Sequence, residues 1–192
     1  MIRLHHKCFL PSERASVGIL KSRVIARKSE PHAIIVMGVM ACGKTTIGIK
    51  LAEALGCVFV EGDDFHPPAN VAKMTSSIPL IDEDRWPWLE AVAGEINSRN
   101  GTVVASCSAL KYAYRARLRE SINKSVSFVW LNISRSVLEE RLRARKGHFM
   151  PTELLDSQLQ ALEPPGATEE AIVIDDPDTA QVVCTLLSRL KG

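Results

Sequence analysis

The stretch Gly38-Val-Met-Ala-Cys-Gly43-Lys44-Thr45 decides the fold class of this 192-residue chain. It matches the pattern GxxxxGK[ST], follows an apolar run at residues 33–37 and opens a helix-like segment at residues 44–55, which is the context that the pattern requires. The two glycines let the backbone wrap a phosphate closely with its N–H groups turned inward, and the helix start adds the positive end of its dipole. The stretch therefore predicts a phosphate-binding loop (P-loop).

The residues of this loop have separate expected roles. Lys44 is expected to reach the β- and γ-phosphates as a catalytic cation, and the Thr45 hydroxyl is expected to ligate Mg²⁺. ATP and Mg²⁺ are therefore the predicted cofactors. The predicted nucleotide-binding residues are Gly38, Val39, Met40, Ala41, Cys42, Gly43, Lys44, Thr45 and Thr46.

From Ala33 onward, short apolar runs alternate with longer helix-like stretches, which is typical of a mostly parallel sheet covered by helices. The predicted strands are Ala33–Met37, Cys57–Val60, Thr102–Ser106, Val126–Ile133 and Ala171–Ile174. The predicted helices are Lys44–Leu55, Pro87–Ser98, Tyr112–Ser121, Val137–Arg145, Thr152–Leu162 and Pro177–Leu190, the last with Asp176 as its cap. The pattern predicts the α/β class.

Two other classes of P-loop protein lack their signatures here. A GTPase needs an Asn-Lys-x-Asp motif, but the only Asn-Lys pair, at Asn123, is followed by Ser125 and Val126. A motor or transport ATPase needs a mid-chain strand that ends in a carboxylate for Mg²⁺. The strands at Thr102–Ser106 and Val126–Ile133 end instead in hydroxyl and amide residues.

An acidic turn, Glu61-Gly-Asp63-Asp64-Phe-His66-Pro67, follows the second predicted strand. The loop at the carboxyl end of a strand beside the P-loop strand is expected to face the phosphates. A carboxylate there can hold Mg²⁺ through water and accept a proton from an attacking hydroxyl. Asp63 is the predicted residue for both tasks, with Glu61 or Asp64 assisting the metal. An acidic surface turn is the simpler alternative.

Several ordered blocks resemble the gluconate kinase (gluconokinase) family of P-loop small-molecule kinases. The resemblance runs from about Ile34 to the C-terminus. It rests on residues 62–67, Asn70, Lys73-Met74, residues 79–89, residues 107–112, Tyr114-Arg115, residues 143–150 and residues 158–164.

The resemblance implies transfer of the ATP γ-phosphate to the 6-hydroxyl of D-gluconate. It implies a three-layer fold, with a five-stranded parallel sheet, helices on both faces and a helical lid, and a homodimer. Asp63 is similar to the carboxylate that orients the acceptor hydroxyl. The substrate-binding residues implied are Asp63, His66, Lys73, Arg85, Lys111 and Arg115. Arg85 and Arg115 can each offer a planar fork to a carboxylate, and which of them binds that of gluconate stays open.

Four cations, Arg141, Arg143, Arg145 and Lys146, precede Gly147 at the end of a predicted helix. Cations at a helix C-terminus are favourable on dipole grounds alone. A glycine hinge preceded by arginines also suits a lid that closes over ATP and brings a guanidinium to the developing charge. The family's lid lies here, so Arg145, which is nearest the hinge, is the predicted catalytic arginine.

The sequence departs from the family's usual pattern in two loops and at Glu61, which stands where Asp is common. Met40 and Ala41 replace the usual Ser and Gly of the P-loop, and Ala41 is expected to require a negative φ, since alanine is strained at positive φ. Residues 75–77 (Thr-Ser-Ser) stand where a glycine commonly precedes the Pro-Leu pair. These changes put nucleotide affinity and the loop beside the acceptor in question.

Residues 1–30 carry seven Lys/Arg against two Glu, whereas the rest of the chain has 24 − 7 = 17 basic and 22 − 2 = 20 acidic residues. We expect residues 1–30 to be an unstructured extension, with a targeting peptide or nucleic-acid arm as the alternatives, and residues 31–192 to be the kinase domain. The core has no basic run for nucleic acid and no apolar run for a membrane. Five scattered cysteines fit reduced thiols in a cytoplasmic protein.

Two alternatives to a gluconate kinase stay open. Shikimate is also a hydroxylated carboxylate, so a shikimate kinase-like enzyme needs similar charges, although His66-Pro67 and Trp86-Pro-Trp88 favour gluconate. A catalytically weak, regulatory nucleotide-binding protein is the second alternative, and the altered P-loop keeps it open. The retention of Lys44, Asp63 and the lid arginines argues against it.

Overall fold

The computed structural model describes residues 30–144, 152–175 and 178–190. Five parallel strands form one sheet in the order β2-β3-β1-β4-β5. They are β1 (His32–Met37), β2 (Val58–Glu61), β3 (Val103–Ser106), β4 (Ser125–Leu131) and β5 (Ile172–Ile174). The prediction of a five-stranded parallel sheet is confirmed, and each strand boundary lies within two residues of the predicted one.

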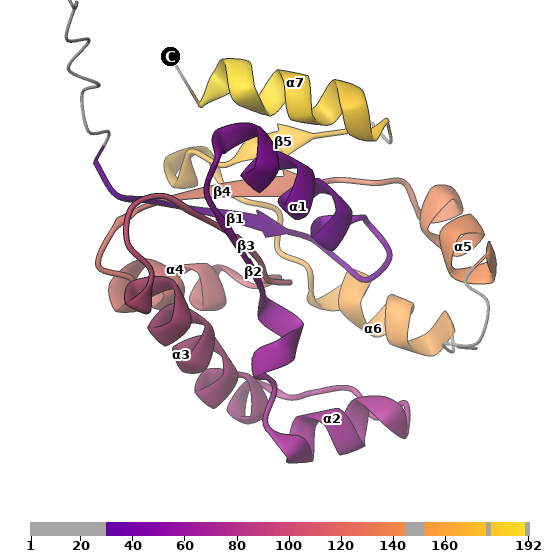
Figure 1. Cartoon of the computed structure of the whole chain (residues 1–192). Coiled ribbons are helices and arrows are strands. Elements are labelled where there is room, and N and C mark those ends of the chain that lie inside the picture. Colours follow the sequence, from indigo (N-terminus) through magenta and orange to yellow (C-terminus); the bar gives the residue numbers. More distant parts are fainter. Residues whose placement is uncertain (1–29, 145–151, 176–177, 191–192) are drawn as a thin grey trace, which may run out of the picture.

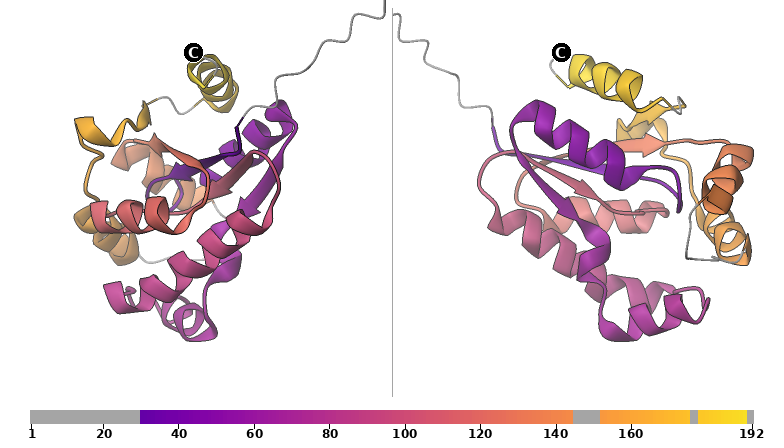
Figure 2. Two further views of the ribbon diagram at one scale, coloured as in Figure 1. Left: turned by 90° about the vertical axis from the view of Figure 1, so that its left-hand side faces the viewer. Right: turned by 45° about the vertical axis from the view of Figure 1, so that its right-hand side comes forward.

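Helices cover both faces of this sheet (Figures 1 and 2). The α-helices are α1 (Lys44–Leu55), α2 (Pro68–Thr75), α3 (Asp82–Ser98), α4 (Tyr112–Ser121), α5 (Arg135–Ala144), α6 (Thr152–Ala161) and α7 (Thr179–Arg189), and two short 3₁₀ helices are η1 (Gly62–Phe65) and η2 (Ala167–Glu169). α1 and α7 lie on one face, and α3 and α4 on the other (Figure 1). None of the described helices has the length and apolar content that crossing a bilayer requires.

The central strand β1 is buried on both of its faces. Ile34 and Val36 pack with α1 and α7, whereas Ile35 and Met37 pack with α3 and α4, including the fully buried Trp88. Alternation of side chains across a strand produces these two apolar cores, one in each layer. The continuous apolar run in the sequence is therefore explained by a strand with no solvent-facing side.

The strand order corrects one expectation from the sequence. β2 does not lie beside the P-loop strand β1, because β3 lies between them. After α1 the chain enters the sheet two strand positions away from β1, and the position between them is occupied by β3, which comes after β2 in the sequence. The turn that follows β2 must therefore reach across the end of β3 to face the P-loop.

The starts of α3, α5 and α7 differ from the predicted ones, α5 beginning at Arg135 and not at Val137, and α6 and α7 each end one residue earlier than predicted. α3 begins at Asp82, five residues before Pro87, because the Asp84 carboxylate accepts the Ile81 N–H (3.0 Å) and three acidic residues stabilise the first turn. α2, which is short and begins at a proline, was not predicted. α7 begins at Thr179, and its cap is Asp178, whose carboxylate accepts the Gln181 N–H at 3.1 Å. The predicted cap and first residue of this helix, 176 and 177, lie outside the described residues.

Candidate active site

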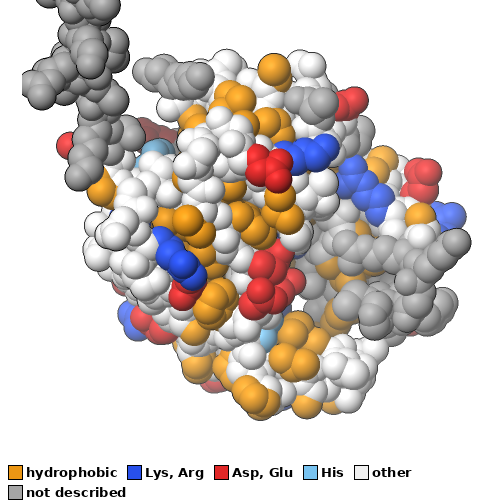
Figure 3. Space-filling view, in the orientation of Figure 1, with side chains coloured by type: hydrophobic (Ala, Val, Ile, Leu, Met, Phe, Trp, Pro, Cys, Tyr) orange, Lys and Arg blue, Asp and Glu red, His pale blue; other side chains and the backbone are white. Residues whose placement is uncertain are grey.

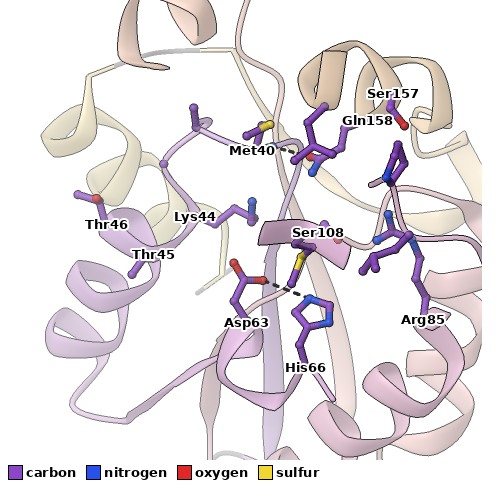
Figure 4. A pocket seen from close by; sticks show the side chains of 16 residues that line it. Met40, Lys44, Thr45, Thr46, Asp63, His66, Arg85, Ser108, Ser157 and Gln158 are labelled. Carbon is purple, nitrogen blue, oxygen red and sulfur yellow. Dashed lines mark hydrogen bonds and ion pairs between the residues drawn. The ribbon is translucent and has the colours of Figure 1, made fainter. Parts of the chain in front are cut away.

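A cavity of about 250 Å³ opens between the P-loop, η1, the segment from α2 to the start of α3, and α6. Figure 4 shows Lys44, Asp63, His66 and Arg85 around it, with Gln158 on the side of α6. The space-filling view shows acidic side chains beside a histidine near the middle of this side of the molecule (Figure 3). The lining residues are Met40, Ala41, Gly43, Lys44, Thr45, Thr46, Asp63, His66, Met74, Pro79, Leu80, Arg85, Ser108, Leu154, Ser157 and Gln158.

The P-loop has the backbone that phosphate binding requires. Gly38 and Gly43 have φ values of 137° and 104°, which only glycine adopts without strain. Gly43 precedes the first turn of α1, and no side chain in the described part of the chain caps this helix start. Its N–H groups are therefore available to an anion. The Lys44 ammonium donates to the Val39 carbonyl at 3.1 Å, within the same loop.

Two side chains from helices far away in the sequence form hydrogen bonds to the backbone of the P-loop. The Met40 N–H donates to Gln158 Oε1 of α6 at 2.7 Å. Arg141 Nη1 of α5 donates to the carbonyls of Cys42 (2.8 Å) and Ala41 (3.3 Å). The sequence analysis gave neither residue a role in the P-loop, because each contact joins residues about 100 or more positions apart and no local motif marks it. Arg141 was expected to be one of the lid cations, with Arg145 the first candidate among them.

Gly62 brings the acidic turn across the end of β3. Its N–H donates to Ser106 Oγ at 3.1 Å, and a Cβ at this position would lie 2.1 Å from the Ser106 carbonyl oxygen, so only glycine fits. Ser106 also donates to the Glu61 carboxylate. The turn therefore places Asp63 in the cavity, with its side chain 68% exposed, while Asp64 is exposed and does not line the cavity.

His66 is held in one orientation. Its ring stacks on Trp88 with centroids 4.2 Å apart, and the Asn70 amide nitrogen lies 3.3 Å from its Nδ1. Because that same nitrogen donates to the Asp84 carbonyl at 2.7 Å, it is a donor, and Nδ1 is the acceptor. The proton of the neutral ring is then on Nε2, which lies 3.9 Å from Asp63 Oδ1. Burial lowers the pKa of His66, the Asp63 carboxylate raises it, and the Arg85 guanidinium lowers it further.

The predicted substrate-binding residues separate into two groups. Asp63, His66 and Arg85 line the cavity. Lys73 and Lys111 do not line it: each ammonium lies 2.6 Å from a carboxylate of α3, that of Asp84 and Asp82 respectively. These two cations fasten α2 and the start of α4 to the first turn of α3.

Arg115 also lies outside the cavity. Its side chain is 1% exposed, and its guanidinium forms two hydrogen bonds to the Glu169 carboxylate, at 2.5 and 2.9 Å. The remaining nitrogen donates to the carbonyls of Ala109 and Leu110, at 3.1 and 3.0 Å. Between Arg85 and Arg115, the structure therefore places only Arg85 where it can meet a substrate carboxylate. Arg145 lies outside the described residues, and its role stays a prediction.

The donor set fits a hydrated magnesium ion. Thr45 and Asp63 contribute a hydroxyl and a carboxylate to the same cavity. Within residues 30–144, 152–175 and 178–190, no cluster of three or more His, Cys, Asp or Glu side chains could hold a metal ion. Mg²⁺ is commonly bound by one or two protein oxygens together with water and phosphate oxygens, so this sparse set suits it better than zinc or calcium.

Comparison with known proteins assigns the family. Residues 34–165 match the family described as AAA domain. A gluconokinase of Gluconobacter oxydans is 43% identical over 164 residues, which cover 83% of this chain and 91% of that protein. The chain belongs to the gluconokinase family. The thermosensitive gluconokinase of Escherichia coli is 45% identical over 145 residues, 74% of this chain and 77% of its own length.

Solved structures agree with the gluconokinase family. The crystal structure of a gluconokinase from Sinorhizobium meliloti has a TM-score of 0.75 and 45% sequence identity, and the match covers 83% of this chain and 93% of that one. A shikimate kinase from Bacteroides thetaiotaomicron has a TM-score of 0.59 at 21% identity, covering 83% of this chain and 98% of that one. The second match shows a shared fold alone.

The two loops that the sequence analysis singled out, at Ala41 and at residues 75–77, have a backbone that suits glycine. Ala41 and Ser77 both have a φ of 60°. The expectation that Ala41 needs a negative φ was therefore wrong, because the turn between the two P-loop glycines stays left-handed without a glycine there. Ser77 is the left-handed residue that terminates α2. The N–H of the next residue, Ile78, donates to the Lys73 carbonyl at 2.8 Å, as is usual at such a helix end.

We expect Ser77→Gly to raise the free energy of unfolding by about 0.5 kcal/mol, because relief of left-handed strain exceeds the added flexibility of the unfolded chain. Ser76 is the matched control, since it is also exposed but has a φ of −86°. Ser76→Gly relieves no strain and should lower the free energy of unfolding by about 0.5–1 kcal/mol. Urea titrations of both variants measure the difference, and an equal loss in both would contradict the assignment of strain to Ser77.

Proposed function

We propose that this chain transfers the γ-phosphate of ATP to the 6-hydroxyl of D-gluconate, giving 6-phosphogluconate and ADP. The observation that carries the proposal is the meeting, in one cavity, of the P-loop residues Lys44 and Thr45 with Asp63 and Arg85. Membership of the family favours gluconate over other acceptors, since its curated members of 43% and 45% identity are named gluconokinases. No observation favours the shikimate or the regulatory alternative over it.

The nucleotide is proposed to lie along the P-loop. A second cavity of about 280 Å³ opens on the other side of the loop, next to Arg141 and the start of α7, with apolar walls from Leu131, Ile133 and Val182. The two cavities share Ala41, Gly43 and Thr46, so a molecule that crosses the loop reaches both. We place the base of ATP in the second cavity and the γ-phosphate at the entrance of the first.

Lys44 and the N–H groups at the start of α1 are proposed to bind the phosphates. Thr45 and Asp63 would hold Mg²⁺, which neutralises charge on the β- and γ-phosphates when it is bound. Arg145 of the predicted lid is proposed to add a further cation near the transferred group. Because phosphoryl transfer depends mainly on positioning and on charge neutralisation, these groups suffice without a covalent intermediate.

Asp63 is proposed to orient the acceptor and take its proton. The 6-oxygen attacks the γ-phosphorus, the bond from that phosphorus to the β,γ-bridging oxygen breaks, and ADP leaves. The hydroxyl proton passes to the Asp63 carboxylate. His66, with its proton on Nε2 facing Asp63, can donate to the same hydroxyl oxygen, while Arg85 offers a planar fork to the gluconate carboxylate.

The test is ADP release by the purified full-length chain with ATP and Mg²⁺, measured with gluconate, shikimate, other sugar acids and no acceptor. We expect gluconate-dependent turnover on the order of 1–100 s⁻¹, as is typical of kinases, and little release with shikimate or without acceptor. Turnover of another acceptor only would overturn the substrate. Nucleotide binding without turnover of any acceptor would favour the regulatory alternative.

A further inference from the structure

We propose that Gln158 determines specificity for the acceptor: the Met40 N–H holds its side-chain oxygen, and its Nε2 amino group donates hydrogen bonds to gluconate in the cavity. The inference rests on the proposed function and adds to it a substrate-binding residue on α6. Neither the P-loop motif nor the acidic turn contains this residue.

The contact with the P-loop fixes which way the amide of Gln158 points. A backbone N–H can only donate, so the atom that lies 2.7 Å from the Met40 nitrogen must be the amide oxygen. The amide is planar, and its amino group therefore points away from this contact. Figure 4 shows Gln158 reaching Met40 from α6 at the edge of the cavity that it lines.

The position of Gln158 favours the acceptor over the nucleotide as its ligand. Leu154, Ser157 and Gln158 of α6 all line the first cavity, together with Asp63, His66 and Arg85. No residue of α6 is among the described residues that line the second cavity, where we place the base. Gln158 also occupies the Met40 N–H, which is therefore not available to a phosphate.

The chemistry of the cavity explains why a neutral donor is useful there. Asp63 is the only carboxylate among the described residues that line it, and two cations, Lys44 and Arg85, offset part of the charge of the two anionic substrates. Gluconate also has several hydroxyls, whose oxygens need donors when they leave water. An amide that is already held at its oxygen can supply such a donor without a further loss of side-chain freedom.

Two substitutions separate substrate binding from support of the P-loop. Gln158→Glu keeps an oxygen that can accept the Met40 N–H, but it replaces the amino group by a second, negatively charged oxygen. Gln158→Met keeps the length of the side chain and removes both functions. A purely structural role predicts that Gln158→Met raises the KM for ATP through the P-loop and leaves gluconate affinity unchanged. The added charge of Gln158→Glu would repel ATP and gluconate alike, so a loss confined to gluconate is what supports the amino group as a donor.

We expect Gln158→Glu to lower kcat/KM for gluconate by about 10- to 100-fold, the value of a hydrogen bond to a charged or buried substrate group. The KM for ATP and the melting temperature should stay close to those of the wild type. Gln160→Glu is the matched control: it makes the same change of charge two residues away on the exposed side of α6 and should change kcat/KM less than twofold.

The outcomes separate this inference from the proposed function. If the wild type does not phosphorylate gluconate, the proposed function fails. If it does, and Gln158→Glu keeps the wild-type kcat/KM for gluconate, only the inference about Gln158 fails. An increase in the KM for ATP with an unchanged KM for gluconate would assign Gln158 to the nucleotide and overturn the inference. Should Gln158→Glu not fold, gluconate binding to Gln158→Met, measured by calorimetry, decides: wild-type affinity overturns the inference and a tenfold loss supports it.

Discussion

Replacement of Asp63 by asparagine is expected to lower kcat for gluconate phosphorylation by about 10²- to 10⁴-fold, the usual contribution of a positioned general base. Asparagine has nearly the same shape, but its amide cannot accept the proton of the attacking hydroxyl. Because Asp63 lies on η1 and the P-loop binds phosphates through a different segment, the affinity for ATP without Mg²⁺ should change little. Steady-state kinetics and nucleotide titration measure the two quantities.

Asp64→Asn is the matched control for this experiment. Asp64 belongs to the same 3₁₀ turn, yet it is exposed and does not line the cavity. The sequence analysis left Asp64 open as a helper for the metal; from its position we now expect less than a threefold change in kcat. Equal losses in both variants would mean that the total charge of the turn matters, and not the placement of Asp63.

The second large effect concerns stability. Glu169→Gln is expected to lower the free energy of unfolding by about 3–5 kcal/mol, because it leaves the Arg115 guanidinium buried without a compensating charge. The two side chains are only 1% (Arg115) and 7% (Glu169) exposed, and Glu169 also accepts the Gly166 N–H at 2.9 Å. Urea titration measures the loss. Glu90→Gln breaks the exposed pair with Arg117 and should cost no more than about 1 kcal/mol.

The same pair predicts a dependence on pH. The Arg115 hydrogen bonds hold the pKa of Glu169 below its ordinary value of 4.5. The stabilisation is therefore present above pH 4.5 and is lost as the pH falls through the lowered pKa of the folded state. The difference in stability between the wild type and Glu169→Gln should shrink in that acidic range, and a difference that stayed constant there would show that the carboxylate charge is not what stabilises the fold.

Arg115 and Glu169 also support the active site from a distance. Arg115 donates to the carbonyls of Ala109 and Leu110, and Ala109 has a φ of 42°. This turn directly follows Ser108, which lines the cavity and whose carbonyl accepts the Gly38 N–H at 3.2 Å. The buried pair therefore keeps a strained turn in place beside the first glycine of the P-loop.

The elements that the sequence predicted well have local signals. The P-loop has a fixed pattern between an apolar strand and a helix, and α1 was predicted to the residue. The inner strands β1 and β3 are short apolar runs because both of their faces are buried, whereas the edge strands β2 and β5 are partly exposed and are marked by β-branched residues instead. The order of the strands has no such signal, since it depends on where each crossover returns the chain.

The predictions for the site residues likewise succeeded where the signal is local and failed where the partner of the residue lies elsewhere in the chain. Asp63 and His66 stand in one short acidic turn beside the cavity, and their placement could be expected from that turn. Lys73, Lys111 and Arg115 stand in equally characteristic blocks, yet their charges are matched by Asp84, Asp82 and Glu169 from other parts of the chain. A cation that binds a substrate and a cation that binds a neighbouring helix look alike until the partner is known.

The most direct test of the central claim is the ³¹P spectrum, recorded with proton coupling, of the product made from ATP and gluconate by the wild-type chain. A phosphate on the 6-oxygen couples to the two protons of a primary carbon, and we predict a single new ester signal split into a triplet. A doublet would place the phosphate on a secondary hydroxyl, and a singlet would place it on the carboxylate; either would contradict the proposed reaction. Absence of any new ester signal, with ATP intact, would contradict the assignment of gluconate as the acceptor.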